Sequence, residues 1–227
     1  MNDAKGYTLV EILVAVAVSL VLLGAVYAAV NSVQRSSAGI ERKVTAQQDV
    51  RPALELMAME IRMASYDPNF VTDIWRSTAD CASVAANQPY RGIQTATADS
   101  ITVEMDIDGS SSVGDHPNEV ISYAYDATEY YITRATNCGT AQPFLGDRAD
   151  SGRPRTVRVV NDTAKPVFRY YDGSGNEITA LPAGIPNIRT IEITLVVETA
   201  EVDPHTGNPR TMIYSTTVIP RNHAPLP

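Results

Sequence analysis

The sequence predicts an α+β protein in which a long N-terminal helix packs on an antiparallel β-sheet. Residues 7–30 are apolar and nearly uncharged, and a helical repeat of apolar residues continues to about residue 66. The rest of the chain consists of short alternating segments separated by turn residues. The 227 residues suffice for one soluble domain and one membrane anchor.

The apolar segment over residues 7–30 reads YTLVEILVAVAVSLVLLGAVYAAV. At about 1.5 Å per residue, a helix of this length spans roughly 36 Å, enough to cross a hydrocarbon core of about 30 Å. Lys5 precedes the segment and Arg35 follows it, so basic charge is confined to its flanks. We therefore expect a membrane-spanning helix.

One carboxylate, Glu11, interrupts this segment. A carboxylate in a membrane helix costs about 2.5–3.5 kcal/mol on insertion scales, so we expect it to have a function and a partner. The segment contains no Lys, Arg or His. A positive partner arises only if the chain is cut after Gly6, which exposes the α-amine of Tyr7. The two groups could then pair within one helix or between neighbouring subunits.

Residues 5–14, KGYTLVEILV, resemble the class III signal of type IV prepilins and of type II secretion pseudopilins. The resemblance implies that a prepilin peptidase cleaves after Gly6 and methylates Tyr7, the new N-terminal residue. It also implies that Glu11, the fifth residue of the mature chain, sets the register of subunits in a filament. The family usually has Phe at the position of Tyr7.

Two other interpretations of the N-terminus remain open. A conventional secretory signal has an apolar core of about 7–15 residues, shorter than this one, although Val26-Tyr27-Ala28 resembles a cleavage site. A plain single-pass anchor would make Glu11 incidental.

Helical character is expected to continue beyond the membrane segment. Leu54, Met57 and Ile61 recur at helical spacing and predict a face that packs on the sheet. Pro52 is expected to bend or locally break this helix because it lacks a backbone donor. Pro68 is expected to end it.

The predicted organisation has four parts. Residues 1–6 form a leader, 7–30 the membrane or filament-core helix, 31–66 its continuation on the head, and 67–227 a β-rich globular head. Strands are expected at residues 101–107, 120–125, 130–133, 157–160, 167–171, 188–198 and 210–219, with irregular segments at 69–99 and 137–155.

The head also carries strings similar to those of PilW-type minor pilins and J-type pseudopilins. They are QDVRPALE at 48–55, FRYYDG at 168–173 and VIPRN at 218–222. The order of helix and sheet that this resemblance implies is the order predicted above.

Composition excludes several functions. The net charge of −8 argues against nucleic acid as a direct partner, because phosphate binding depends on clustered Lys and Arg. The sequence has no phosphate-binding loop and no G-x-S-x-G motif, and its three histidines are scattered. We therefore expect no enzymatic activity and no resident cofactor.

One loop of the predicted head offers ligands of the kind that calcium prefers. Asp106, Asp108 and Asp115 surround Gly109 and Gly114 and offer hard oxygen ligands. A solvated hairpin turn accounts for the same residues, and both interpretations stay open.

The chain has two cysteines, Cys81 and Cys138. If the head is exported, they could form one disulfide worth roughly 4 kcal/mol; otherwise they are reduced thiols.

The resemblance of the N-terminal signal and of the head strings favours a minor pilin. We expect this subunit to be anchored in the bacterial inner membrane with its head in the periplasm, and then to be built into a pilus at the cell surface. The resemblance implies as partners prepilin peptidase, the inner-membrane assembly platform, other minor pilins and the major pilin. One alternative is a minor pseudopilin of type II secretion. Another is a membrane-tethered adhesin or binding module.

Overall fold

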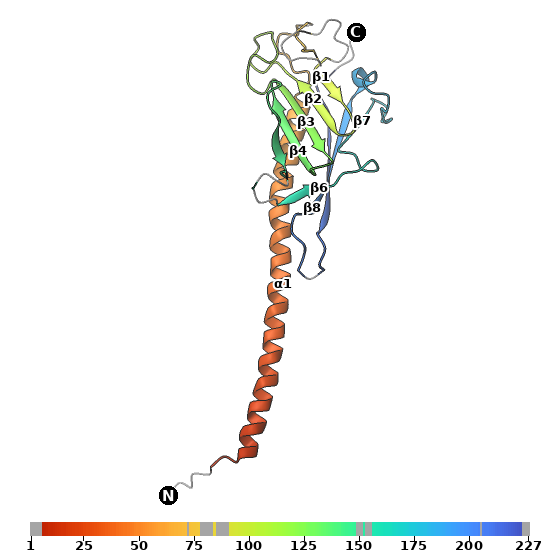
Figure 1. Ribbon diagram of the computed structural model, residues 1–227. Helices are drawn as coiled ribbons and strands as arrows, with labels where there is room; N and C mark the ends of the chain where they lie inside the picture. Colours follow the sequence, from red (N-terminus) through yellow and green to blue (C-terminus); the bar gives the residue numbers. More distant parts are fainter. Residues whose placement is uncertain are drawn as a thin grey trace.

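The computed structural model describes residues 6–71, 73–77, 84, 91–148, 152, 156–204 and 206–223. It consists of one long helix, α1 (Leu9–Arg62), and a β-rich head that packs on the second half of this helix (Figure 1). The first half of α1 extends away from the head. This arrangement confirms the predicted α+β class.

Helix α1 runs through Pro52 as a single element of 54 residues, so of the expected bend or break the break does not occur. Pro52 removes the donor to the carbonyl of Gln48, and both residues are exposed, so water can satisfy that carbonyl. The helix ends at Arg62, four residues before the expected end at residue 66 and well ahead of Pro68. Its C-cap is Met63, whose N–H donates to the carbonyls of Glu60 and Ile61.

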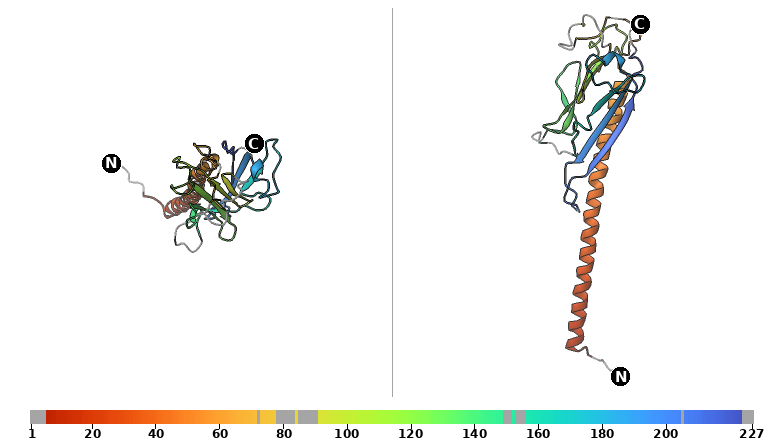
Figure 2. Two further views of the ribbon diagram at one scale, coloured as in Figure 1. Left: turned by 90° about the horizontal axis from the view of Figure 1, so that it is seen from above. Right: turned by 90° about the vertical axis from the view of Figure 1, so that its right-hand side faces the viewer.

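The head contains two antiparallel sheets (Figures 1 and 2). The first is a meander in the order β1-β2-β3-β4-β5, and the second has β8 at its centre, paired with β6, β7 and β9. The strands are β1 (Ile93–Ala96), β2 (Ser100–Glu104), β3 (Val120–Asp126), β4 (Tyr131–Thr136), β5 (Gln142–Leu145), β6 (Val157–Val159), β7 (Phe168–Tyr171), β8 (Thr190–Thr199) and β9 (Thr211–Val218), and a short 3-10 helix, η1 (Ile185–Asn187), precedes β8.

Each segment that the alternation of side chains predicted as a strand contains one. The sequence did not predict β1 or β5, which lie in segments expected to be irregular. Both are four residues long, too short for a pattern of alternation to emerge. The expected strand at 101–107 ends at Glu104, because the chain turns there into the loop that carries Asp106 and Asp108.

The core lies where α1 meets both sheets. The helix packs against β8 and β9 of the second sheet and β5 of the first. Its buried face includes Ala46, Val50, Met57 and Ile61, each fully buried. The strands contribute the rest of the cluster, among them Ile93, Ile101, Val103, Ile121, Tyr123, Ile132, Phe168, Ile191, Ile193, Leu195, Val197 and Val218.

The head begins on the helix at Gly39, which is the first buried residue of α1. A Cβ at this position would lie 3.3 Å from the carboxylate oxygens of Asp203, so glycine permits the connection between β8 and β9 to approach the helix closely. One turn later Arg42 forms an ion pair of 2.7 Å with Glu201 in the same connection. Among the described residues of α1, none before Gly39 is buried.

Candidate functional site

The start of α1 is fixed by a capping box. Thr8 is the N-cap, and its hydroxyl accepts the backbone N–H of Glu11 at 3.3 Å. In return, Glu11 Oε2 accepts the backbone N–H and the hydroxyl of Thr8, both at 2.9 Å. Such a box pairs N–H groups that the first helical turn cannot pair itself. The helix therefore begins at Leu9, directly after the N-cap Thr8.

The bond between Gly6 and Tyr7 lies outside the helix. Both residues are exposed and have no regular structure. A Cβ on Gly6 would meet nothing within 4 Å, so the fold itself does not require glycine there. The predicted cleavage position is thus presented on a free, non-helical segment immediately before the cap.

The first half of α1 exposes apolar side chains on every side. None of its apolar 18-residue window is buried, and the helix is long and apolar enough to cross a membrane. An all-round apolar helix needs lipid or neighbouring helices as its surroundings. Its exposed large side chains are Leu9, Val10, Ile12, Leu13, Val14, Val16, Val18, Leu20, Val21, Leu22, Leu23, Val26, Tyr27, Val30 and Val33.

Glu11 is exposed on this surface, within the first helical turn. Its hydrogen bonds to Thr8 are local, and no basic side chain occurs between Gly6 and Gln34. Threonine supplies donors but no charge, so a carboxylate placed in lipid here stays without a counter-charge. Glu11 thus has a local hydrogen-bond partner in Thr8, but its negative charge has no positive partner within the segment.

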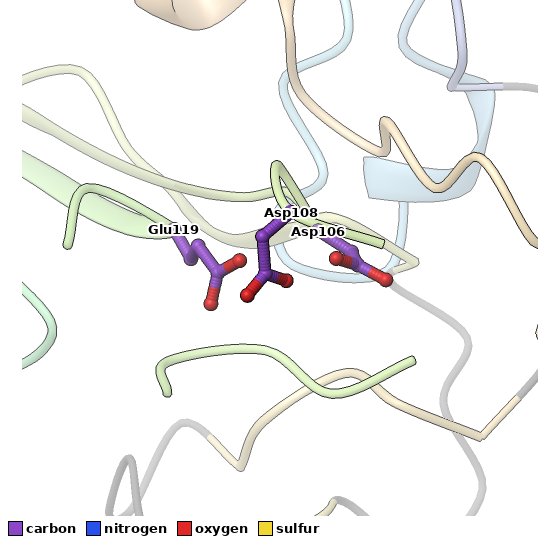
Figure 3. Close-up of side chains that lie close together, drawn as sticks. All are labelled: Asp106, Asp108 and Glu119. Atoms are coloured by element: carbon purple, nitrogen blue, oxygen red, sulfur yellow. The ribbon is translucent and has the colours of Figure 1, made fainter. Parts of the chain in front are cut away.

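In the head, Figure 3 shows the side chains of Asp106, Asp108 and Glu119 lying close together. One carboxylate oxygen from each lies within 4.8 Å of those from the other two. Asp106 and Glu119 are fully buried, and Asp108 is exposed. The prediction placed Asp115 in this group; its carboxylate instead accepts the hydroxyl of Ser110 at 3.3 Å, and Glu119 takes the third position.

The two buried carboxylates already accept backbone N–H groups. Asp106 accepts those of Gly109 at 2.7 Å and Ser111 at 2.9 Å. Glu119 accepts three, from Ile107 at 3.1 Å, Gly114 at 2.9 Å and His116 at 3.0 Å. These bonds hold the loop between β2 and β3 in shape. Calcium binding at this group stays a prediction.

Asp108 also contributes to the loop. The backbone N–H of Ser110 donates to its carboxylate at 2.9 Å, and this bond lowers the pKa of Asp108 below its ordinary value. The carboxylates of Asp106, Asp108 and Glu119 are therefore each stabilised by backbone N–H donors of the loop, as expected for acidic residues that shape a turn.

A further buried carboxylate, Glu104 at the end of β2, has a different environment. It accepts the side-chain amide of Gln94 at 2.8 Å and the backbone N–H of Arg76 at 3.2 Å. Burial raises the pKa of Glu104 to about 8, against the lowering effect of these donors and of the charge of Arg76.

We expect the Glu104→Gln substitution to reduce the pH dependence of stability. The unfolded chain releases the Glu104 proton near pH 4.5 and the folded chain near pH 8, so the free energy of unfolding falls as pH rises between these values. Urea unfolding from about pH 5 to pH 8 should show the wild type losing roughly 3–4 kcal/mol more than the Gln variant. Exposed Glu55→Gln is the control, and equal slopes in wild type and Glu104→Gln would contradict the expectation.

Of the two cysteines, Cys138 lies within the described residues. No cysteine among the described residues is free. Cys138 follows β4, whereas Cys81 lies outside the described residues. The disulfide between Cys81 and Cys138 therefore stays a prediction.

Sequence reasoning missed Thr8 and Glu119. Thr8 could have been found, because Thr8-Leu9-Val10-Glu11 fits the capping-box pattern. Glu119 had no such signal. It reaches Asp106 through the pairing of β2 with β3, in which the N–H of Met105 donates to the carbonyl of Glu119 at 2.8 Å.

Comparison with known proteins yields one match. Residues 1–27 match the family described as the prokaryotic N-terminal methylation motif. No curated protein and no solved structure matches the chain. The match covers residues 1–6, Thr8, Glu11 and most of the apolar segment, and it fits membrane anchoring through α1. The N-terminal segment of this chain therefore carries the methylation motif of type IV pilin-like precursors.

Proposed function

We propose that the chain is a minor pilin, a structural subunit that takes part in the assembly or initiation of a type IV pilus. The observation that carries the proposal is the first half of α1, which is apolar on all sides and contains one carboxylate, Glu11, directly after a non-helical Gly6–Tyr7 bond. The methylation motif over the same residues supports it and favours a structural subunit over an enzyme.

The proposed sequence of events starts in the inner membrane. Prepilin peptidase cuts the precursor after Gly6 and methylates the amine of Tyr7, which stays cationic. The assembly platform then moves the subunit from lipid into a filament, where apolar helices replace lipid as neighbours. In that low-dielectric interior Glu11 pairs with an N-terminal amine, which fixes the axial position of the subunit.

The head supports a minor rather than a major subunit. It combines two sheets with long connections, such as the one between β2 and β3, and this breadth favours a place at the tip with other minor pilins over dense repetition along a shaft. A minor pseudopilin of type II secretion would use the same helix in a different machine. Purification from the native cell with identification of partners distinguishes the two.

The Gly6→Ala substitution is expected to leave an unprocessed, unmethylated precursor. A Cβ at this position meets nothing within 4 Å, so the substitution changes the peptidase substrate and not the fold. Mass spectrometry of the membrane-bound protein should find the wild type beginning at methylated Tyr7 and the variant retaining residues 1–6.

Gly24→Ala is the matched control, because a Cβ at Gly24 in the middle of the apolar segment also meets nothing within 4 Å. That variant should be processed as the wild type is. A wild-type protein that still begins at Met1, or that begins beyond Ala28, would overturn the proposed function.

A further inference from the structure

The head contains a cavity of about 440 Å³ that the proposed assembly does not use. It lies between the two sheets, and its walls come from Ala98, Asp99 and the end of β3 on one side. On the other side they come from β7 and the segments 161–166 and 177–181. None of the described residues that line it belongs to α1, so lipid or neighbouring helices on α1 do not fill it. Its volume lies within the range of ligand-binding pockets, about 300–1,000 Å³.

The inner wall of the cavity is apolar and held in place. Phe168 and Tyr170 of β7 are buried, and Ile178 and Leu181 lie beside them. The hydroxyl of Tyr170 donates to the carbonyl of Thr97 at 2.9 Å, which ties β7 to the opposite wall. This wall suits the methylene stem of a ligand.

The cavity is also acidic. Of the described charged residues that line it, three are carboxylates, Asp99, Asp162 and Glu177, and one is a cation, Arg169. Arg169 is already paired: its guanidinium donates to the carbonyl of Ala164 at 2.7 Å and lies 3.9 Å from Glu177, which lines the cavity too.

The two aspartates differ in their availability. One oxygen of Asp162 accepts the backbone N–H groups of Ala164 and Lys165. Asp99 is exposed, and none of the hydrogen bonds found in the described part of the chain engages its carboxylate. Asp99 is therefore the charge most available to a ligand.

The acidic residues of the cavity also act on Tyr125, which lines it. The pKa of Tyr125, whose hydroxyl donates to the carbonyl of Val159 at 2.9 Å, is raised to about 12. Burial contributes most, followed by Tyr130 and the negative charges of Asp99, Asp126 and Asp162. Negative charges that disfavour the phenolate form of Tyr125 favour a cation at the same position.

We propose that this cavity binds a basic side chain, lysine or arginine, presented by another protein. The methylene stem lies on the wall formed by Tyr170, Ile178 and Leu181, and the cationic group reaches Asp99 beside the ring of Tyr125. The cavity exceeds the volume of a single side chain, so it also accommodates the backbone that carries one. This proposal does not depend on filament assembly.

The test uses the full chain in detergent micelles and isothermal titration calorimetry. The probes are the capped tripeptides Gly-Lys-Gly and Gly-Arg-Gly, their neutral counterparts with norleucine and citrulline, and 1,5-diaminopentane as a free amine. The basic peptides should bind at least about tenfold more tightly than their neutral counterparts. The Asp99→Asn substitution should weaken binding about fivefold, whereas the control Asp115→Asn, which changes an acidic residue outside the cavity, should not.

Three results would overturn the proposal. They are equal affinity for the lysine and norleucine peptides, an equal effect of the two Asp→Asn substitutions, and absence of binding by either basic peptide. If 1,5-diaminopentane binds as tightly as the lysine peptide, the cavity binds a free amine, and the proposal that another protein presents the basic group is wrong. Each result leaves processing after Gly6 unaffected, so this proposal can fail while the proposed function holds.

Discussion

Cells that produce the Glu11→Ala variant are expected to insert and process the precursor normally but to assemble at least about tenfold fewer filaments than the wild type. Insertion should not suffer, because removal of a carboxylate from a membrane helix lowers its transfer cost by about 2.5–3.5 kcal/mol. Assembly should suffer, because the N-terminal amine of a neighbouring subunit loses its counter-charge in an apolar interior. Sheared surface filaments and membrane fractions, quantified by immunoblot, measure the two effects separately.

The capping box provides the controls for this experiment. Glu11→Gln keeps a side-chain oxygen that can accept the N–H of Thr8 but removes the charge, so it should fail as Glu11→Ala does. Thr8→Ala removes the hydroxyl that accepts the N–H of Glu11 but keeps the carboxylate, at a cost of about 1 kcal/mol in helix stability. It should assemble nearly normally. Wild-type assembly by Glu11→Gln together with failure of Thr8→Ala would show that the carboxylate acts as a cap and not as a charge.

The features that could be read from the sequence are those encoded locally. The apolar segment, the position of Glu11 and the helical repeat of Leu54, Met57 and Ile61 each depend on residues within a few turns of one another. Long strands such as β8 also show their alternation directly: its inward residues Ile191 and Ile193 are fully buried, and Glu192 between them is not.

The features that could not be predicted depend on partners distant in the chain. β1 is a strand because Ile93 and Ala96 pair with β2, and its four residues carry no pattern of their own. In the same way, the pairing of β2 with β3 brings Glu119 to Asp106 and leaves Asp115 beside Ser110. Proximity in sequence made Asp115 the obvious third ligand, but strand register decided otherwise.

A buried ionic group between helix and sheet is a second feature without a sequence signal. Glu60 of α1 accepts Arg134 of β4 through two bonds, Nη2 to Oε1 at 2.6 Å and Nε to Oε2 at 3.1 Å. The hydroxyl of Tyr123 in β3 donates to the same carboxylate. The bond to Glu60 raises the pKa of Arg134, and burial raises that of Tyr123. Both carboxylate oxygens of Glu60 thus accept hydrogen bonds at the interface between α1 and the first sheet.

The Arg134→Leu substitution is expected to lower the free energy of unfolding of the head by about 3 kcal/mol. It leaves the carboxylate of Glu60, whose side chain is only 11% exposed, without a counter-charge. Urea unfolding of the full chain in detergent, followed by tyrosine fluorescence, measures the loss.

Two further variants determine the cause of that loss. Arg169→Leu breaks a longer and more exposed pair, in which Arg169 and Glu177 lie 3.9 Å apart, and should cost less than about 1 kcal/mol. Adding Glu60→Gln to Arg134→Leu removes the unpaired charge and should restore part of the stability. If the double variant is as unstable as the sum of its single substitutions, the loss comes from side-chain packing around Arg134, and Glu60 has no electrostatic role in holding the head to the helix.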